Sequence, residues 1–337
     1  MSDEALSSLS VIGAGAWGTA LAVALQRAGR PVTLWAREPE VVRQINETRE
    51  NGIFLPGVDV PQEVRATGDL GAAARAEALL LVVPAQHLRA VSRNLAPHVA
   101  PRTPVILCAK GVEQETAALM SEVLAVAMPQ AVAAVLTGPT FASEIARGLP
   151  AAVTLAIGDA ELGRRLIATM GSGRFRPYLS DDVIGAQIGG AVKNVLAIAA
   201  GIVGGRKLGE NARAAMITRG LHEMVRLGEA LGGRMETLMG LSGVGDLMLT
   251  CMSTKSRNYS VGYALGEGKS LSEALGGKPS VAEGVFSASA VAMLAARHGV
   301  QMPISHAVDA VVNHDADIGQ MIEELLSRPF TSEYAGR

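Results

Sequence analysis

The sequence predicts an α/β fold in which a doubly wound parallel sheet is followed by an all-helical C-terminal domain. In the first half, short apolar runs alternate with helix-like segments, as expected of strands that are covered on both faces. From about Asp181 onward, the segments are longer and carry Ala, Leu and Val at helical spacing. This change of pattern predicts two domains, residues 1–185 and residues 186–337.

The predicted elements follow this division along the chain. Six strands are expected where apolar runs have strand length, at residues 9–12, 32–35, 79–83, 105–108, 133–136 and 153–157. Helices are expected between them, at residues 19–28, 38–49, 85–95 and 115–127. The second half predicts further helices near residues 183–203, 211–231, 287–298, 304–313 and 318–327.

The composition excludes several classes of protein. The chain has 337 residues, of which 49% are hydrophobic, so it can bury a large core and is not mainly disordered. Lys and Arg number 30 against 32 Asp and Glu, and this net charge of −2 argues against a nucleic-acid partner. The two cysteines, Cys108 and Cys251, suit free thiols in a reducing compartment. The six histidines show no paired ligand spacing, so no metal is expected.

The sequence also predicts a cytoplasmic location without integral membrane association. The N-terminus carries Asp3 and Glu4 before any apolar run, which differs from the basic start of an export signal. The most membrane-like segment, residues 186–205, contains Lys193 and Asn194 near its middle. A charge at that depth would be costly in lipid, so a buried helix with a functional lysine is the better interpretation.

A glycine-rich turn joins the first predicted strand to the first predicted helix. Gly13, Gly15 and Gly18 form the pattern G-x-G-x-x-G. In a Rossmann-type domain the first glycine permits a tight turn, the second lets the backbone approach a pyrophosphate, and the third allows helix and strand to pack closely. Backbone N–H groups at the helix start would then bind the anion. The position at the first strand of the series favours dinucleotide binding over a purely structural turn.

The end of the second predicted strand bears on which dinucleotide binds. Arg37 at this point can pair with the 2′-phosphate of NADP(H), whereas an acidic residue would favour NAD(H). Glu38 follows directly, so the sequence leaves use of NADP(H), NAD(H) or both open. The alternative interpretation is a solvated charge pair at a strand end.

Two lysines are candidates for the chemistry. Lys193 lies in a helix that is otherwise apolar all round, where a lysine is rarely tolerated unless it is paired or functional. Such a lysine can polarise a carbonyl and deliver a proton as hydride arrives at carbon. Lys110 follows the predicted strand at residues 105–108, and ligands of open α/β sheets lie beyond the carboxyl ends of strands. The alternatives are a lysine whose charged end reaches solvent and an ordinary loop lysine.

Three further segments offer ligand groups. Gly138 and Thr140 follow the next strand, where backbone N–H groups and a hydroxyl could meet a ligand or could form only a turn. Asp246 and Thr250 supply a carboxylate and a hydroxyl in an apolar stretch. The segment Ser256, Arg257 and Asn258 sets a guanidinium between two hydrogen-bonding side chains, which suits a phosphate monoester.

Taken together, these residues resemble the NAD(P)-dependent glycerol-3-phosphate dehydrogenase family, in particular its bacterial biosynthetic type. The matching blocks run in order along most of the chain: VIGAGAWGT at 11–19, FLPG at 54–57, AKGV at 109–112, LTGPTFA at 136–142, GGAVKN at 189–194, LSGVGDLMLTC at 241–251 and SRN at 256–258. Ala16 departs from the pattern, because many relatives carry serine there. Alanine loses any bond from that hydroxyl but leaves backbone contacts to phosphate.

The resemblance implies reversible hydride transfer from NAD(P)H to C2 of dihydroxyacetone phosphate, giving sn-glycerol 3-phosphate for glycerophospholipid biosynthesis. By matched position it implies that Lys193 is the catalytic acid/base and that Lys110 contacts substrate and cofactor. It implies a substrate site that also includes Gly138, Thr140, Asp246, Ser256, Arg257 and Asn258. It implies a cofactor site that also includes Gly13, Gly15, Ala16, Trp17, Gly18, Arg37, Ala142, Arg257, Val281 and Glu283. It further suggests a homodimer.

Two other functions remain open on the sequence. One is another two-domain NAD(P)-dependent hydroxyacid dehydrogenase, which would share the glycine turn and a helical lysine-asparagine pair but should not need phosphate-binding groups around Arg257. The other is a non-catalytic sensor of NAD(P), against which the predicted burial of Lys193 argues.

Overall fold

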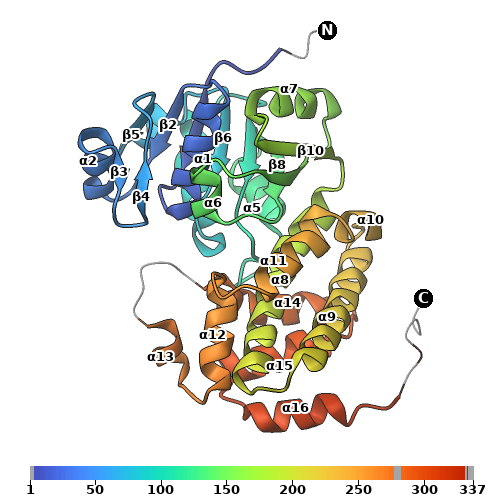
Figure 1. Cartoon of the computed structure of the whole chain (residues 1–337). Coiled ribbons are helices and arrows are strands. Elements are labelled where there is room, and N and C mark those ends of the chain that lie inside the picture. Colours follow the sequence, from blue (N-terminus) through green and yellow to red (C-terminus); the bar gives the residue numbers. More distant parts are fainter. Residues whose placement is uncertain (1–3, 277–281, 331, 333–337) are drawn as a thin grey trace.

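The computed structural model describes residues 4–276, 282–330 and 332. Figure 1 shows a sheet flanked by helices in the N-terminal part and a group of helices in the C-terminal part. Two clusters of buried side chains centre on the sheet, and a third lies among the C-terminal helices. This confirms the predicted fold class.

The main sheet has eight strands in the order β10-β9-β8-β7-β6-β1-β2-β5. They are β1 (Leu9–Ile12), β2 (Val32–Trp35), β5 (Val64–Thr67), β6 (Ala78–Leu81), β7 (Pro104–Leu107), β8 (Val132–Thr137), β9 (Ala151–Ala156) and β10 (Phe175–Ser180). The six predicted strands are confirmed with small shifts at their ends. The sequence missed β5 and β10, which are the two edge strands and include exposed residues, whereas β1, β6 and β7 in the middle of the sheet are fully buried.

The sheet departs from the parallel arrangement at one pair of strands. From β5 to β8 all neighbours are parallel, but β9 pairs with β8 antiparallel, and β10 is parallel to β9. The connection between β8 and β9 contains only the five-residue helix α6 (Ala142–Ala146). A helix this short does not carry the chain back along the sheet, so β9 starts at the edge where β8 ends.

Six further helices lie in the sheet-containing part: α1 (Ala16–Arg27), α2 (Pro39–Glu47), α3 (Leu70–Ala73), α4 (Leu88–Leu95), α5 (Met120–Ala127) and α7 (Ala160–Met170). The predicted helix at 115–127 begins only at Met120. The preceding residues turn, with Ala117 at φ 51° and Val112 bridging to Leu119. A small antiparallel pair, β3 (Glu50–Asn51) and β4 (Leu55–Asp59), was not predicted.

The C-terminal part is helical, as predicted. Its α-helices are α8 (Val183–Gly205), α9 (Glu210–Ala230), α10 (Met235–Leu238), α11 (Asp246–Cys251), α12 (Arg257–Gly266), α13 (Leu271–Leu275), α14 (Glu283–Arg297), α15 (Pro303–Asn313) and α16 (Ile318–Leu326). A π-helical turn, Leu241–Gly245, leads into α11. The five predicted helices correspond to α8, α9, α14, α15 and α16. Helices α10, α11 and α13 were missed because they have only four to six residues, and α12, with ten, was missed because it mixes polar residues and glycine with apolar ones.

Helix α8 forms the centre of the helical part and packs very closely on α12. A Cβ atom at Gly201 would lie 2.1 Å from the carbonyl oxygen of Tyr259, and one at Gly262 would lie 2.0 Å from that of Ile198. Among the described helices, only α8 has the length and hydropathy to cross a membrane, and 89% of its most apolar window is buried inside the protein. Its apolar character is therefore accounted for by the core.

Candidate active site

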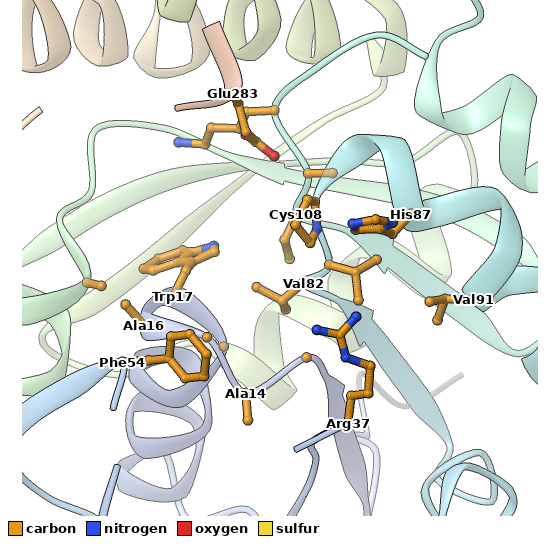
Figure 2. Close-up of a pocket in the computed structure, with 18 of the residues that line it drawn as sticks. Ala14, Ala16, Trp17, Arg37, Phe54, Val82, His87, Val91, Cys108 and Glu283 are labelled. Carbon is orange, nitrogen blue, oxygen red and sulfur yellow. The ribbon is translucent and has the colours of Figure 1, made fainter. Parts of the chain in front are cut away.

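A cavity of about 610 Å³ opens at the carboxyl ends of the central strands. Its walls come from the segments that follow β1, β2, β6, β7 and β8, with additions from α8, α12 and α14. In Figure 2, Arg37 and Glu283 lie toward opposite ends of this cavity, with Trp17 and Cys108 at intermediate height and Phe54 to the left of Arg37. Parallel α/β sheets bind ligands at this edge.

The structure brings most of the sequence-predicted site residues to this cavity. Those that line it are Gly13, Gly15, Ala16, Trp17, Gly18, Arg37, Lys110, Thr140, Ala142, Lys193, Asn258 and Glu283. Gly138, Asp246, Ser256 and Arg257 are not in its lining, although Gly138 and Asp246 bond directly to lining lysines. Val281 lies outside the described residues.

Two glycines of the first turn are required by the backbone. Gly13 has φ 115°, and a Cβ atom there would lie 2.8 Å from the carbonyl oxygen of Val82. A Cβ atom at Gly18 would lie 1.7 Å from the carbonyl oxygen of Gly13. No side chain caps the N-terminus of α1, so this end of the helix offers backbone N–H groups to the cavity.

Two lysines and one aspartate form a buried cluster at the cavity wall. Lys193 Nζ lies 3.1 Å from Asp246 Oδ1 and donates to Thr250 Oγ1 at 2.9 Å. Lys110 Nζ lies 2.7 Å from Asp246 Oδ2 and donates to the carbonyl oxygen of Gly138 at 3.0 Å. One carboxylate thus holds both ammonium groups, which come from α8 and from the segment after β7.

Burial and charge act in opposite directions in this cluster. Burial is the largest influence on Lys193 and lowers the pKa of its ammonium, while the Asp246 carboxylate opposes that shift. Burial alone would raise the pKa of Asp246, but Lys110 and Lys193 outweigh it and hold that pKa below its usual range. Lys193 is therefore a cation that gives up its proton more readily than an exposed lysine.

A chain of amide hydrogen bonds fixes the surroundings of the cluster. Asn194 Nδ2 donates to the carbonyl oxygen of Lys110 at 2.9 Å, and Asn258 Nδ2 donates to Asn194 Oδ1 at 2.9 Å. The backbone N–H of Gly284 donates to Asn258 Oδ1 at 3.0 Å. These bonds join the segment after β7 to α8, α12 and α14 around one wall of the cavity.

Comparison with known proteins decides which family the chain belongs to. The family model described as NAD-dependent glycerol-3-phosphate dehydrogenase N-terminus matches residues 8–163, and the C-terminus model matches residues 182–323. A Parvibaculum lavamentivorans protein named glycerol-3-phosphate dehydrogenase (NAD(P)+) is 59% identical over 329 residues, covering 98% of this chain and 99% of its own. A Rhodospirillum rubrum protein of the same name is 57% identical over 332 residues, covering 98% of this chain and 95% of its own.

The solved structures agree with these matches. A crystal structure of glycerol-3-phosphate dehydrogenase from Coxiella burnetii is 40% identical, with a TM-score of 0.92, and the match covers 97% of this chain and 100% of that one. The chain belongs to the NAD-dependent glycerol-3-phosphate dehydrogenase family. It is therefore an NAD(P)-dependent oxidoreductase.

The cavity fits the dinucleotide of an NAD-dependent glycerol-3-phosphate dehydrogenase. A Cβ atom at Gly15 would meet nothing within 4 Å, so the backbone there is open to an approaching pyrophosphate. Nε1 of Trp17 is buried without a hydrogen-bond partner in the described part of the chain. An unpartnered donor in the cavity lining is expected where a ligand completes the site.

Arg37 and Glu38, which left the choice between NADP(H) and NAD(H) open in the sequence, both line the cavity of this dehydrogenase. They form an ion pair of 2.8 Å, and the side chain of Arg37 is 77% exposed. An exposed pair of this kind contributes little to stability. The guanidinium is therefore available to an incoming phosphate. The Glu38 carboxylate beside it lowers the net positive charge that the pair presents to that phosphate.

Some cavity residues of this dehydrogenase were missed by sequence reasoning. His87 and Val91, on the 3₁₀ turn at Ala85–His87 and on α4, line the cavity together with Ile53. A single histidine and two aliphatic residues carry no distinguishing pattern. Val82 and Pro84 could have been found, because they follow β6 at the edge where ligands bind.

Proposed function

We propose that the chain reduces dihydroxyacetone phosphate to sn-glycerol 3-phosphate reversibly, with Lys193 as the general acid/base. The observation that carries this is the buried Lys193–Asp246–Lys110 cluster beside a cavity that fits a dinucleotide. NADPH or NADH, when bound, supplies the hydride. The product would feed glycerophospholipid biosynthesis.

In this proposal the proton comes from Lys193. As charge develops on the substrate ketone oxygen, the Lys193 ammonium stabilises that oxygen and donates a proton to it. Asp246 keeps Lys193 charged before the step, and Thr250 accepts one of its N–H groups, so the remaining donor can face the substrate. Lys110 adds a second positive charge at the same wall.

The phosphate of the substrate is assigned to the start of α12. Ser256 caps this helix by accepting from the backbone N–H of Tyr259 at 3.3 Å, and Arg257 is its first residue. Arg257 is half-buried, and burial lowers the pKa of its guanidinium, which is a cost that a bound dianion would offset. We place Gly138 and Thr140 on the opposite side of the substrate, next to Lys110.

A single assay tests this function. Purified protein should oxidise NADPH or NADH in the presence of dihydroxyacetone phosphate and release sn-glycerol 3-phosphate. If NADPH or NADH were oxidised in the presence of a 2-keto acid but not of dihydroxyacetone phosphate, the protein would be a hydroxyacid dehydrogenase instead. Coenzyme binding with no turnover on either substrate would indicate a sensor.

Arg257→Ala is expected to lower kcat/KM for dihydroxyacetone phosphate by about 10- to 100-fold, since charge-assisted hydrogen bonds contribute about 1.5–3 kcal/mol. Activity with unphosphorylated dihydroxyacetone should not change. Arg257→Lys keeps the charge but loses the planar guanidinium, so its kcat/KM for dihydroxyacetone phosphate should lie between those of wild type and Arg257→Ala. If kcat/KM fell equally with the phosphorylated and the unphosphorylated ketone, Arg257 would not be the residue that binds the phosphate.

Arg37→Ala is expected to lower the ratio of kcat/KM for NADPH over that for NADH by about tenfold, because the 2′-phosphate loses a charge-assisted partner. Arg43→Ala is the matched control, since Arg43 is exposed on α2 and pairs with Glu40. A ratio that stays constant in Arg37→Ala would show that Arg37 does not recognise the 2′-phosphate.

We also propose a domain boundary near residue 185, a cytoplasmic homodimer and a cofactor contact by Val281. The separate matches of the two family models to residues 8–163 and 182–323 support the boundary. Sedimentation of the purified protein would test the dimer.

A further inference from the structure

A second cavity, of about 220 Å³, lies at the other end of α1 from the coenzyme turn. Its floor is apolar and buried, formed by Ala24, Ile145 and Phe175. Arg27, Ser172 and Arg174 stand in its wall. Helix α1 has 12 residues, so at about 1.5 Å per residue its two ends are about 17 Å apart. None of the residues lining this cavity lines the first one.

Two exposed arginines, Arg27 and Arg174, line this cavity, and neither forms an ion pair with an acidic side chain among the described residues. Arg27 Nη1 donates to the carbonyl oxygen of Ile145 at 3.3 Å, and Arg174 Nη1 donates to that of Gly148 at 3.3 Å. A Cβ atom at Gly148 would lie 3.1 Å from Arg27 Nη1, so both groups approach the same residue. The nearby carboxylate of Glu144 is held by Lys255 at 2.9 Å.

Ordinary structural roles account for only part of this arrangement. Arg27 lies in the last turn of α1, where the helix dipole favours a cation. Arg174 has no such helix end to favour its charge. Each guanidinium has five N–H donors, of which the protein uses one long bond apiece. Both side chains are exposed at the wall of one cavity, so their remaining donors are open to solvent and to a ligand.

We propose that this second cavity binds a small phosphate monoester. A phosphate dianion would neutralise the two guanidinium groups, whereas a monocarboxylate would leave one positive charge. The buried floor would take the carbon skeleton of the ester. The volume is about a third of that of the coenzyme cavity, which fits a single phosphorylated fragment and not a dinucleotide. The same chemistry occurs in a soluble sugar or glycerol phosphate and in the headgroup of phosphatidic acid.

Titration calorimetry with inorganic phosphate and with sn-glycerol 3-phosphate tests this site. With NADPH saturating, wild type should bind one more equivalent of titrant than Arg27→Gln/Arg174→Gln. Alternatively, the variant should keep the equivalent but bind it with an affinity at least tenfold lower. Arg27→Lys/Arg174→Lys should lie between them, because it keeps the charge and loses the forks. The matched control is Arg65→Gln/Arg75→Gln, which removes two exposed charges from elsewhere in the sheet-containing part.

Vesicle flotation separates the two sources of the phosphate. If the occupant is lipid, wild type should float with phosphatidylcholine vesicles containing phosphatidic acid and bind soluble esters poorly at this site. If it is soluble, only calorimetry should show the difference. Unchanged stoichiometry and affinity in the Gln variant, with no difference in flotation, would overturn the proposal, as would equal losses in the control. The Gln variant should keep kcat with dihydroxyacetone phosphate, so this result is independent of the proposed function.

Discussion

Lys193→Ala is expected to reduce kcat for reduction of dihydroxyacetone phosphate by about 10³-fold, because general acid catalysis contributes about 10² to 10⁴ in rate. The ammonium contacts Asp246 and Thr250 at the wall of the cavity and lies in the middle of the buried stretch of α8, Gly185 to Ile202. Removing it leaves the developing alkoxide without its proton donor. Stopped-flow measurement of NADPH oxidation gives the rate.

Coenzyme binding distinguishes a catalytic loss from a folding loss. NADPH should bind Lys193→Ala with an affinity near that of wild type, as measured by quenching of its fluorescence. Lys193→Met keeps the length of the side chain without the charge, and it should be as slow as the alanine variant. A kcat close to wild type in either variant would rule out Lys193 as the acid.

The pH profile gives a further check on the same group. Reduction needs the charged form of Lys193, so the rate should fall as pH rises through the pKa of this lysine, which burial places below that of an exposed lysine. In Asp246→Asn the carboxylate that favours the ammonium is gone, and the pKa should fall further. The alkaline limb of kcat should therefore move to lower pH in this variant.

Gly262→Ala is expected to destabilise the protein by about 3 kcal/mol, at the upper end of overpacking costs. Gly262 lies inside α12, where helix propensity alone would favour alanine by about 1 kcal/mol. The added Cβ atom would lie 2.0 Å from the carbonyl oxygen of Ile198, so α12 would have to move away from α8. Packing outweighs propensity here, and thermal unfolding should show a lower Tm.

Gly158→Ala is the matched control for this substitution. Gly158 is not among the glycines with positive φ, and a Cβ atom there would meet nothing within 4 Å. Its Tm should stay at or slightly above that of wild type, because alanine restricts the unfolded chain. If Gly262→Ala had the same Tm as Gly158→Ala, α8 and α12 would not pack as closely at Gly262 as described.

The sequence predicted the buried parts of the fold better than its edges. The central strands are continuous apolar runs, whereas β5 and β10 each have one exposed face and mix Arg with apolar residues. The direction of β9 depends on the length of a connecting helix, which apolar periodicity does not report. Helix α12, which is capped by Ser256, carries polar residues and glycines among its apolar ones, so its sequence lacks a clear apolar face.

The site was predictable where chemistry limits the choice of residue. A lysine in an apolar helix and glycines in a strand-to-helix turn are unusual, and the structure brings Lys193 and Gly13 to one cavity. That a single carboxylate, Asp246, would hold both Lys110 and Lys193 required the tertiary structure. His87 has no neighbour in sequence that marks it, and only the fold shows its place in the cavity.

The close crossing at Gly201 and Gly262 has a consequence for catalysis. Lys193 is carried by a helix with little room to shift, since the backbones of α8 and α12 are in contact near Ile198 and Tyr259. The conformational entropy of its backbone is lost once, when the chain folds, and not in each turnover. The position of Lys193 is therefore fixed by folding before the substrate binds, and fixing it adds nothing to the activation free energy. Loosening that crossing should slow the chemistry before the fold is lost.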